Sequence, residues 1–208
     1  MTRSAAAAAF SHACRCGKTR LTVTVPSRAA GTHIRCYCRD CQTAARLHDR
    51  DEDTLSPAGG TDVWHTVPEL IEIEAGADTL QISRLSPRGG YRWYAGCCGT
   101  LMFSTVRNLA IPFVSVALRQ PEMQAAGNLL GPVRCHAFTA SARPHSDAPG
   151  ANKGMRRAGA LALKRAVISW LGGGSRRSPL RQPDGTPIAP VDVISLEMRK
   201  AALPDHLK

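Results

Sequence analysis

Residues 32–41, THIRCYCRDC, contain a short predicted strand at residues 32–37 that leads directly into three cysteines. Residues 40–47 are predicted to form a short helix, with Asp40 available as its N-cap. Further short strands, most of them marked by alternating apolar and polar residues, are predicted at residues 19–25, 69–75, 80–85, 91–94, 100–104 and 111–118. Many short strands joined by turns indicate an antiparallel, mainly β domain, interrupted by a polar loop at residues 49–60.

The pattern changes near residue 150. Apolar side chains then recur at helical spacing and predict one amphipathic helix, with a stripe made of Ala160, Leu163, Val167, Trp170 and Leu171. Trp170 is expected in the core, and the three glycines at residues 172–174 are expected to end the helix. A Pro/Arg-rich loop and a last short helix at residues 192–203 follow. The sequence thus predicts a zinc-binding β domain at residues 1–150 and a basic helix and tail at residues 151–208 that pack on it or extend from it.

Charge and hydropathy restrict the class of protein. The formal net charge is +11, and residues 151–208 supply +7 of it, with 11 Lys/Arg against 4 Asp/Glu. A basic segment of this kind indicates either contact with phosphates or acidic surfaces, or simply a solvated face. No apolar run approaches the roughly 20 residues that a membrane helix needs, so we expect no membrane span. The apolar stretch at residues 5–10 is short for a signal peptide, and we interpret it as a frayed N-terminus of a cytoplasmic protein.

The run Cys36-x-Cys38-x-x-Cys41 can place three thiolates around one metal ion. Zinc prefers four tetrahedral ligands, so a fourth position is left for water, a substrate or a distant residue. A small thiol is a natural fourth ligand, because zinc lowers its pKa and holds it as a thiolate. Alternatively, Cys135 or His136 closes the site and makes it purely structural. The spacing alone leaves both interpretations open.

Two other cysteine groups each end in a glycine that permits a tight turn: Cys14-x-Cys16-Gly17 and Cys97-Cys98-Gly99. Such short spacings strain a disulfide within one group, which favours metal binding in a reducing compartment. We expect both groups to meet on one structural zinc. Adjacent side chains in an extended segment point apart, so Cys97 and Cys98 can share an ion only if the backbone turns sharply between them.

The order C-x-C-G, C-x-C-x-x-C and a final cysteine followed by Gly-Thr resembles the glutathione-dependent formaldehyde-activating enzyme family, which includes centromere protein V. The resemblance covers roughly residues 10–120. It implies a zinc-pinned antiparallel β-tent with one or two zinc ions. In that family the first and last motifs hold a structural zinc, which here corresponds to Cys14, Cys16 and Cys98. The middle motif holds a second zinc with an open position, associated with adding glutathione to formaldehyde, and corresponds to Cys36, Cys38 and Cys41.

Two positions depart from the family pattern. Ala95 stands where the last motif has a cysteine, and Cys97 is the obvious substitute. Tyr37 stands where the middle motif usually has histidine. Together with the basic C-terminal segment, these departures resemble an offshoot filed as a domain of unknown function.

Three hypotheses about function follow. The first is a zinc-dependent carbon–sulfur lyase or adduct-forming enzyme acting on a small thiol such as glutathione, with Arg39 or Arg92 available to pair with a substrate carboxylate. No local pattern marks a general base; Asp40 and His48 are near only in sequence, and His48 is expected to be exposed. The second is a non-catalytic zinc module that binds nucleic acid or an acidic partner through residues 151–208. The third is a zinc-stapled protein whose second site is closed by another side chain.

Overall fold

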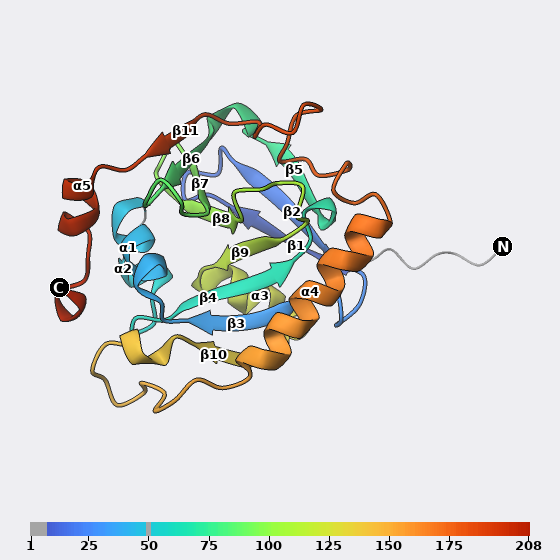
Figure 1. Ribbon diagram of the computed structural model, residues 1–208. Coiled ribbons are helices and arrows are strands. Elements are labelled where there is room, and N and C mark those ends of the chain that lie inside the picture. The colour runs from blue at the N-terminus through green and yellow to red at the C-terminus, as the bar shows by residue number, and fades with distance from the viewer. Residues whose placement is uncertain (1–7, 49–50) are drawn as a thin grey trace.

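Two β-sheets form most of the molecule in the computed structural model, which describes residues 8–48 and 51–208 (Figure 1). The predicted mainly β class, with a helix toward the C-terminus, is confirmed. The strands are β1 Ala8–Ala13, β2 Arg20–Val25, β3 Thr32–Cys36, β4 Thr61–Thr66, β5 Ile71–Ala75, β6 Leu80–Arg84, β7 Tyr91–Ala95, β8 Leu101–Thr105, β9 Val114–Leu118, β10 Cys135–Ala137 and β11 Val191–Val193. The helices are α1 Arg39–His48, α2 Asp51–Thr54, α3 Gln120–Leu130, α4 Met155–Leu171 and α5 Leu196–Ala201, with 3-10 turns at Pro68–Leu70, Ala77–Thr79, Thr139–Ser141 and Asp205–Leu207.

The strands are divided between a small sheet of order β1-β2-β5 and a large sheet of order β10-β3-β4-β9-β8-β7-β6-β11. Adjacent strands are antiparallel except at the two edges of the large sheet, where β10 pairs with β3 and β11 pairs with β6 in parallel. The predicted antiparallel arrangement is thus observed throughout both sheets except at these two edge pairs. A parallel pair needs a long connection that returns to the same end of the sheet, and both edge strands arrive after such a connection.

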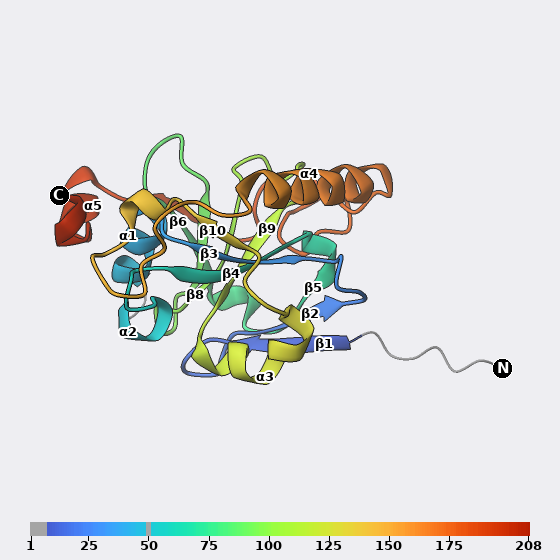
Figure 2. The same cartoon turned by 90° about the horizontal axis from the view of Figure 1, so that it is seen from below.

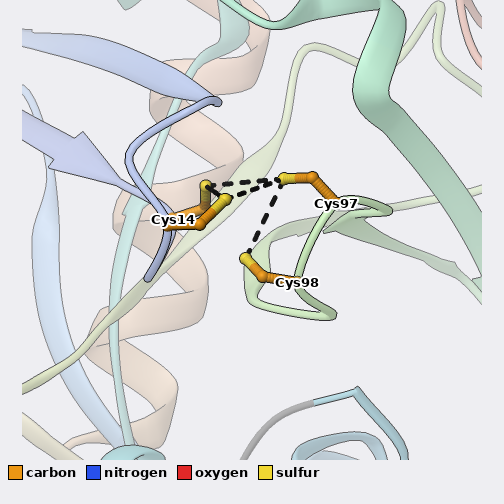
Figure 3. Close-up of side chains that lie close together, drawn as sticks. Cys14, Cys97 and Cys98 are labelled. Atoms are coloured by element: carbon orange, nitrogen blue, oxygen red, sulfur yellow. Dashed lines mark hydrogen bonds between the residues drawn. The ribbon is translucent and has the colours of Figure 1, made fainter.

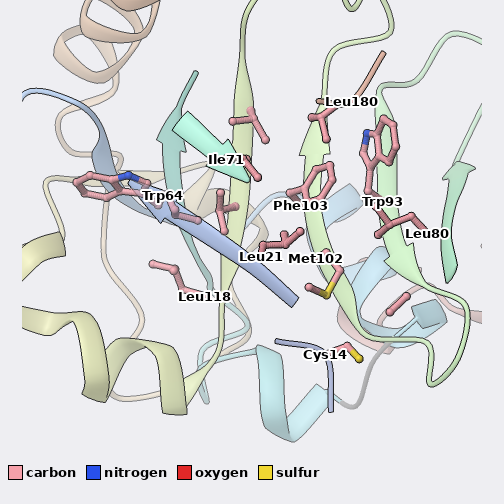
Figure 4. Close-up of a cluster of buried hydrophobic side chains, with 14 of the residues drawn as sticks. Cys14, Leu21, Trp64, Ile71, Leu80, Trp93, Met102, Phe103, Leu118 and Leu180 are labelled. Atoms are coloured by element: carbon pink, nitrogen blue, oxygen red, sulfur yellow. The ribbon is translucent and has the colours of Figure 1, made fainter. Parts of the chain in front are cut away.

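One face of the large sheet packs against the small sheet and forms the main core. Ile82, Trp93, Phe103 and Val116 are neighbours in register across β6, β7, β8 and β9, and all four are fully buried. Leu21 of the small sheet belongs to the same cluster (Figure 4). Because side chains alternate along a strand, this packing assigns the remaining residues of the same strands to the opposite face.

The opposite face of the large sheet carries a row of polar side chains. Ser83, Arg92, Ser104, Ser115 and His65 are successive cross-strand partners on β6, β7, β8, β9 and β4. Helix α4 lies over the β10, β3 and β4 end of this face, while the small sheet and α3 lie on the other side of the large sheet (Figure 2). The polar row therefore begins beneath α4 at His65 on β4 and runs away from the helix across β9, β8, β7 and β6.

Several segments differ from the sequence expectations. The predicted frayed N-terminus is wrong for residues 8–10, which belong to β1 and pair in register with β2; residues 1–7 lie outside the described part. The predicted polar loop contains α2, and its residues 49–50 are not described. Strands β4 and β10 and helix α3 were not predicted. Asp40 is not an N-cap, because α1 begins at Arg39 and Asp40 lies within its first turn.

Helix α4 is confirmed, but its orientation is not as expected. Its C-cap is Gly172, as predicted. Trp170, however, is 61% exposed, and Leu163, Val167 and Leu171 are exposed with it, so the predicted core stripe faces outward. The sheet-facing side instead uses small residues such as Ala158.

The end of the chain is also built differently from the expectation. The segment expected to be the last helix begins as β11 on the edge of the large sheet and becomes helical only in α5. None of the described helices is long and apolar enough to cross a membrane.

Candidate metal centres and the adjoining cavity

Four cysteines from two distant turns converge on one point. The Sγ atoms of Cys14, Cys16, Cys97 and Cys98 all lie within 4.8 Å of one another. The Sγ–Sγ distances are 3.5 Å for Cys14–Cys16, 3.3 Å for Cys16–Cys97, 3.8 Å for Cys14–Cys97 and 3.9 Å for Cys97–Cys98 (Figure 3). Tetrahedral zinc with Zn–S bonds of about 2.3 Å requires sulfur–sulfur distances of about 3.8 Å. The cluster therefore fits a closed four-thiolate site.

Both turns have the backbone geometry that this convergence needs. In the β1–β2 turn, the N–H of Gly17 donates to Cys14 O at 2.9 Å, and the N–H of Thr19 donates to Cys14 Sγ at 3.3 Å. In the β7–β8 turn, the N–H of Gly99 donates to Ala95 O at 2.7 Å. Gly99 has φ of +75°, a left-handed conformation that favours glycine. This turn supplies the sharp bend that the vicinal cysteines require.

Without a bound cation, the thiols of this cluster differ in how readily they ionise, as the pKa values of Cys97 and Cys98 show. Burial, followed by contact with Cys16, raises the pKa of Cys97 to about 12. Burial also opposes ionisation of Cys98, but hydrogen bonds from Thr100 and from the Cys16 backbone outweigh it and lower its pKa to about 6. One thiolate is thus favoured and its neighbour is disfavoured. A divalent cation removes that repulsion and lets all the thiols ionise.

A second cluster contains Cys36, Cys38 and Cys41, whose Sγ atoms also lie within 4.8 Å of one another. Cys36 ends β3, and its Sγ lies 3.7 Å from that of Cys41 in the first turn of α1. The N–H of Cys41 donates to Cys38 Sγ at 3.3 Å, so the backbone turns around the cluster. Contacts among the three thiols, together with burial, raise the pKa of each to about 12. These thiols too require a cation to ionise at neutral pH.

Neither residue proposed to close the second cluster does so. Cys135 packs among apolar side chains that include Ile34 and Val63, and its Sγ is not part of the cluster. His136 lies beside Tyr37, with its Nδ1 3.4 Å from the tyrosine hydroxyl. Within the described residues, three Sγ atoms therefore meet at this point, and no fourth His, Cys, Asp or Glu ligand atom joins them.

The second cluster forms part of the wall of a cavity of about 260 Å³. Cys36 and Cys41 lie on one side, and the polar row Arg92, Ser104, Ser115 and His65 contributes to the lining. A second cavity of about 280 Å³ lies against the inner side of α4 and is largely apolar. The two cavities share the same four lining residues, namely Cys36, His65, Phe113 and Phe138. They are therefore adjacent spaces that meet at the three-cysteine cluster.

Arg92 is the cation of this cavity. Its guanidinium donates to Ser104 Oγ at 2.9 Å, and it forms no ion pair with a carboxylate of the described chain. Burial lowers the pKa of Arg92, but the nearby Cys41, Cys38 and Asp40 outweigh this and raise it. Asp40 itself pairs with Arg199 at 3.2 Å. Of the two arginines suggested by the sequence, Arg92 is at the site, whereas Arg39 is exposed and does not line the cavity.

His48 is not the exposed residue that was expected. Its Nε2 lies 2.6 Å from Ser83 Oγ, and its ring stacks on Tyr94 with centroids 4.2 Å apart. Burial and the charge of Arg92 lower the pKa of His48 to about 4, so the ring is neutral at pH 7. The side chain supports the β6–β7 end of the polar row without lining the cavity.

His65 was missed in the sequence and lines both cavities. Burial and the charge of Arg165 lower its pKa to about 4. Its ring packs edge-on against Phe113 with centroids 4.9 Å apart and forms no hydrogen bond to another described residue. Strand β4 was not recognised because both of its faces are buried, which removes the alternation of apolar and polar residues that marks a half-exposed strand.

The comparisons with known proteins establish the family but no activity. The chain belongs to DUF6151, described as a family of unknown function, whose profile matches residues 7–192. No curated protein matches the chain. One similar solved structure is the crystal structure of a Rhodobacter sphaeroides protein, with 16% identity and a TM-score of 0.43, covering 62% of this chain and all of the other.

Proposed function

We propose that this member of the DUF6151 family binds two zinc ions, and that the second site handles a small thiol in carbon–sulfur bond chemistry. The observation that carries the proposal is the open three-thiol cluster at the wall of a cavity. The resemblance to the glutathione-dependent formaldehyde-activating enzymes supplies the reaction class.

The four-thiol cluster would act as the structural site. Its ligands come from the β1–β2 turn and the β7–β8 turn. Cys14 and Cys97, one from each turn, are 83 positions apart in the sequence. A metal bound there joins the small sheet to the large one and leaves no position for a substrate. Its role is to hold the fold together, as the resemblance also implies.

The three-cysteine cluster would act as the reactive site. Zinc held by Cys36, Cys38 and Cys41 would stabilise a bound substrate thiol as its thiolate. Three thiolates around a divalent cation would leave one net negative charge near Arg92, whose pKa the cysteines raise. The apolar side chains of the cavity exclude water from the substrate sulfur. The neutral ring of His65 can accept or donate a proton at the cavity surface.

The reaction class is balanced without an oxidant. A carbon–sulfur bond forms between the thiol sulfur and the carbonyl carbon of an aldehyde, and the thiol proton passes to the carbonyl oxygen. The reverse reaction breaks the same bond and releases the thiol and the aldehyde. The forward direction needs the two reactants to meet in the cavity with the sulfur ionised, and the reverse direction needs the adduct hydroxyl to return its proton as the carbon–sulfur bond breaks.

Elemental analysis of the purified full chain tests the metal sites. We expect two zinc ions per chain, falling to one in a Cys36→Ser/Cys41→Ser variant. Cys135→Ser is the matched control, because it removes a buried thiol that belongs to neither cluster. A single zinc that the double substitution leaves unchanged would contradict the proposal, since the second cluster would then hold no metal.

Thiol-dependent turnover tests the chemistry. Glutathione and smaller thiols are mixed with formaldehyde and longer aldehydes, and adduct formation is followed by NMR. We expect activity in the native protein and its loss in Cys38→Ala, with zinc in the first site and the unfolding temperature recorded for each protein. Adduct formation at the uncatalysed rate with both zinc sites filled would rule out this activity.

A second function, binding of nucleic acid through residues 151–208, is favoured by one observation. Trp170 is exposed on α4, the helix that also carries the exposed basic residues Arg157 and Lys164. An aromatic side chain beside cations can stack on an unpaired base. Binding of a single-stranded oligonucleotide that weakens steeply with salt and is lost in Trp170→Ala would support it.

A further inference from the structure

We propose that the ligand of the three-cysteine site is a monocarboxylate with an apolar body, its carboxylate bound by Arg92 and its body lying in the cavity beneath α4. This inference rests on the proposed function, because it describes what the molecule held at the open site carries besides its thiol.

Arg92 provides the first line of argument. It lines the cavity together with Cys36 and Cys41, and its one hydrogen bond to a described residue goes to the neutral Ser104. Arg35 and Arg119, by contrast, pair with carboxylates: Arg35 with Asp62 at 2.8 Å, and Arg119 with Glu122 at 2.5 Å. A partly buried guanidinium keeps donors free in a planar fork, which matches a carboxylate. Arg92 is therefore positioned to bind an anionic group that enters the cavity.

The second cavity defines the rest of the ligand. Its wall on α4 is made of small or flexible side chains, including Ala158, Gly159 and Ala162, and no charged side chain lines it. A Cβ built on Gly159 would meet no atom within 4 Å. Gly159 is itself exposed, so a side chain placed there has room at the edge of this space. The space is lined mainly by apolar side chains and suits an apolar group, with His65 as the polar ring in its wall.

Phe138 connects the two cavities. Phe138 lines both cavities and is 51% exposed. Among the described residues it is the one non-glycine residue with a positive φ, which is 59°. A bulky residue in this region is strained, and such strain persists where the surrounding structure holds the residue in place. Phe113 also lines both cavities, so an apolar ligand that spans them would contact both rings.

The charges of the cavity limit the ligand to one carboxylate besides its zinc-bound sulfur. Arg92 is its cation, and His65 is neutral at pH 7 because burial lowers its pKa to about 4. Glutathione carries two carboxylates and an ammonium group, for which the apolar cavity beneath α4 offers no partners. We therefore expect a smaller, less polar thiol acid to fit better than glutathione.

Calorimetry on the zinc-loaded full chain tests this inference with probes that contain no thiol. The probes are 3-phenylpropionate and the uncharged 3-phenylpropan-1-ol, which share the apolar body and differ in the carboxylate. We expect the acid to bind about 10- to 100-fold more tightly than the alcohol. Arg92→Gln should abolish that preference, and Arg92→Lys should retain part of it. Equal binding of acid and alcohol to the native protein would overturn the inference and would mean that Arg92 serves only the thiolates.

A pair of helix variants tests where the apolar body lies. Gly159→Leu places a side chain in the cavity beneath α4 and should weaken binding of the acid at least about tenfold. Ala160→Leu adds the same side chain one position along on the exposed side of the helix and should leave binding unchanged. Equal affinity in both variants would overturn the assigned position.

The zinc content of each sample separates the two proposals. Two zinc ions without discrimination between acid and alcohol refute the inference alone. Loss of the second zinc from the native protein refutes the proposed function, whatever the probes do.

Discussion

Glu122 forms the centre of a buried ionic cluster that anchors β1, and replacing it with glutamine should cost about 3 kcal/mol. The carboxylate is 6% exposed, lies 2.5 Å from the Arg119 guanidinium and 3.3 Å from Nδ1 of His12, and accepts the backbone N–H of Arg119 at 3.0 Å. Burial opposes its ionisation, but His12 and Arg119 outweigh burial and lower its pKa from 4.5 to about 2. Each pKa unit corresponds to about 1.4 kcal/mol, which gives the figure of about 3 kcal/mol for Glu122→Gln.

The sign of the pH dependence follows from the lowered pKa. A carboxylate whose pKa is lowered by folding stabilises the native state above its unfolded pKa, and this contribution is lost as the pH falls through the folded value. The difference in unfolding free energy between native protein and Glu122→Gln should therefore be full at pH 6 and shrink between pH 5 and pH 2. Acid also displaces zinc from thiolates, but that loss affects both proteins, so the difference isolates Glu122.

Urea unfolding, followed by tryptophan fluorescence across this pH range, measures the difference. Glu197→Gln is the matched control, because Glu197 is exposed on α5. The same cluster reaches the first metal centre, since the Arg119 guanidinium also donates to Ala13 O next to Cys14. A pH-independent difference between the two proteins would refute the assignment of the stabilisation to an ionised Glu122.

Three further predictions follow from the site. Gly99→Ala should destabilise the protein by about 1–3 kcal/mol and lower its zinc content, because φ at this position is +75° and the new Cβ would lie 2.8 Å from His48 O. Gly127→Ala on α3 is the control and should change neither quantity, because its new Cβ would lie in open space. Substituting the cysteines of the four-thiol site should lower the free energy of unfolding, measured by urea denaturation, by about 2 kcal/mol more than substituting those of the three-cysteine site. The reason is that a metal in the four-thiol site closes a loop of 83 positions. Binding of 3-phenylpropionate should be constant from pH 5.5 to 8, because the pKa values of His48 and His65 are lowered to about 4; a step near pH 6.5 in calorimetry would contradict this.

Local sequence patterns were sufficient for the elements that are half-exposed. Residues 20–25 alternate apolar and polar side chains and form β2 in the predicted place, because one face meets the core and the other meets solvent. The same rule fails for β4, whose two faces are both covered, and for α4, whose apolar stripe faces outward. In both cases the covering partner is distant in sequence, and a local pattern contains no information about it.

The cysteine spacing by itself determined which thiols form a group, because ligands within a few residues are held together by one turn of backbone. Only the tertiary structure decided which groups meet and what surrounds them. It brought the Cys97–Cys98 turn onto the Cys14–Cys16 turn, kept Cys135 and His136 away from the second cluster, and placed Arg92 and His65 in its cavity. The reason is physical: the sheet register aligns residues from five strands into one row, and that register is fixed by core packing on the opposite face.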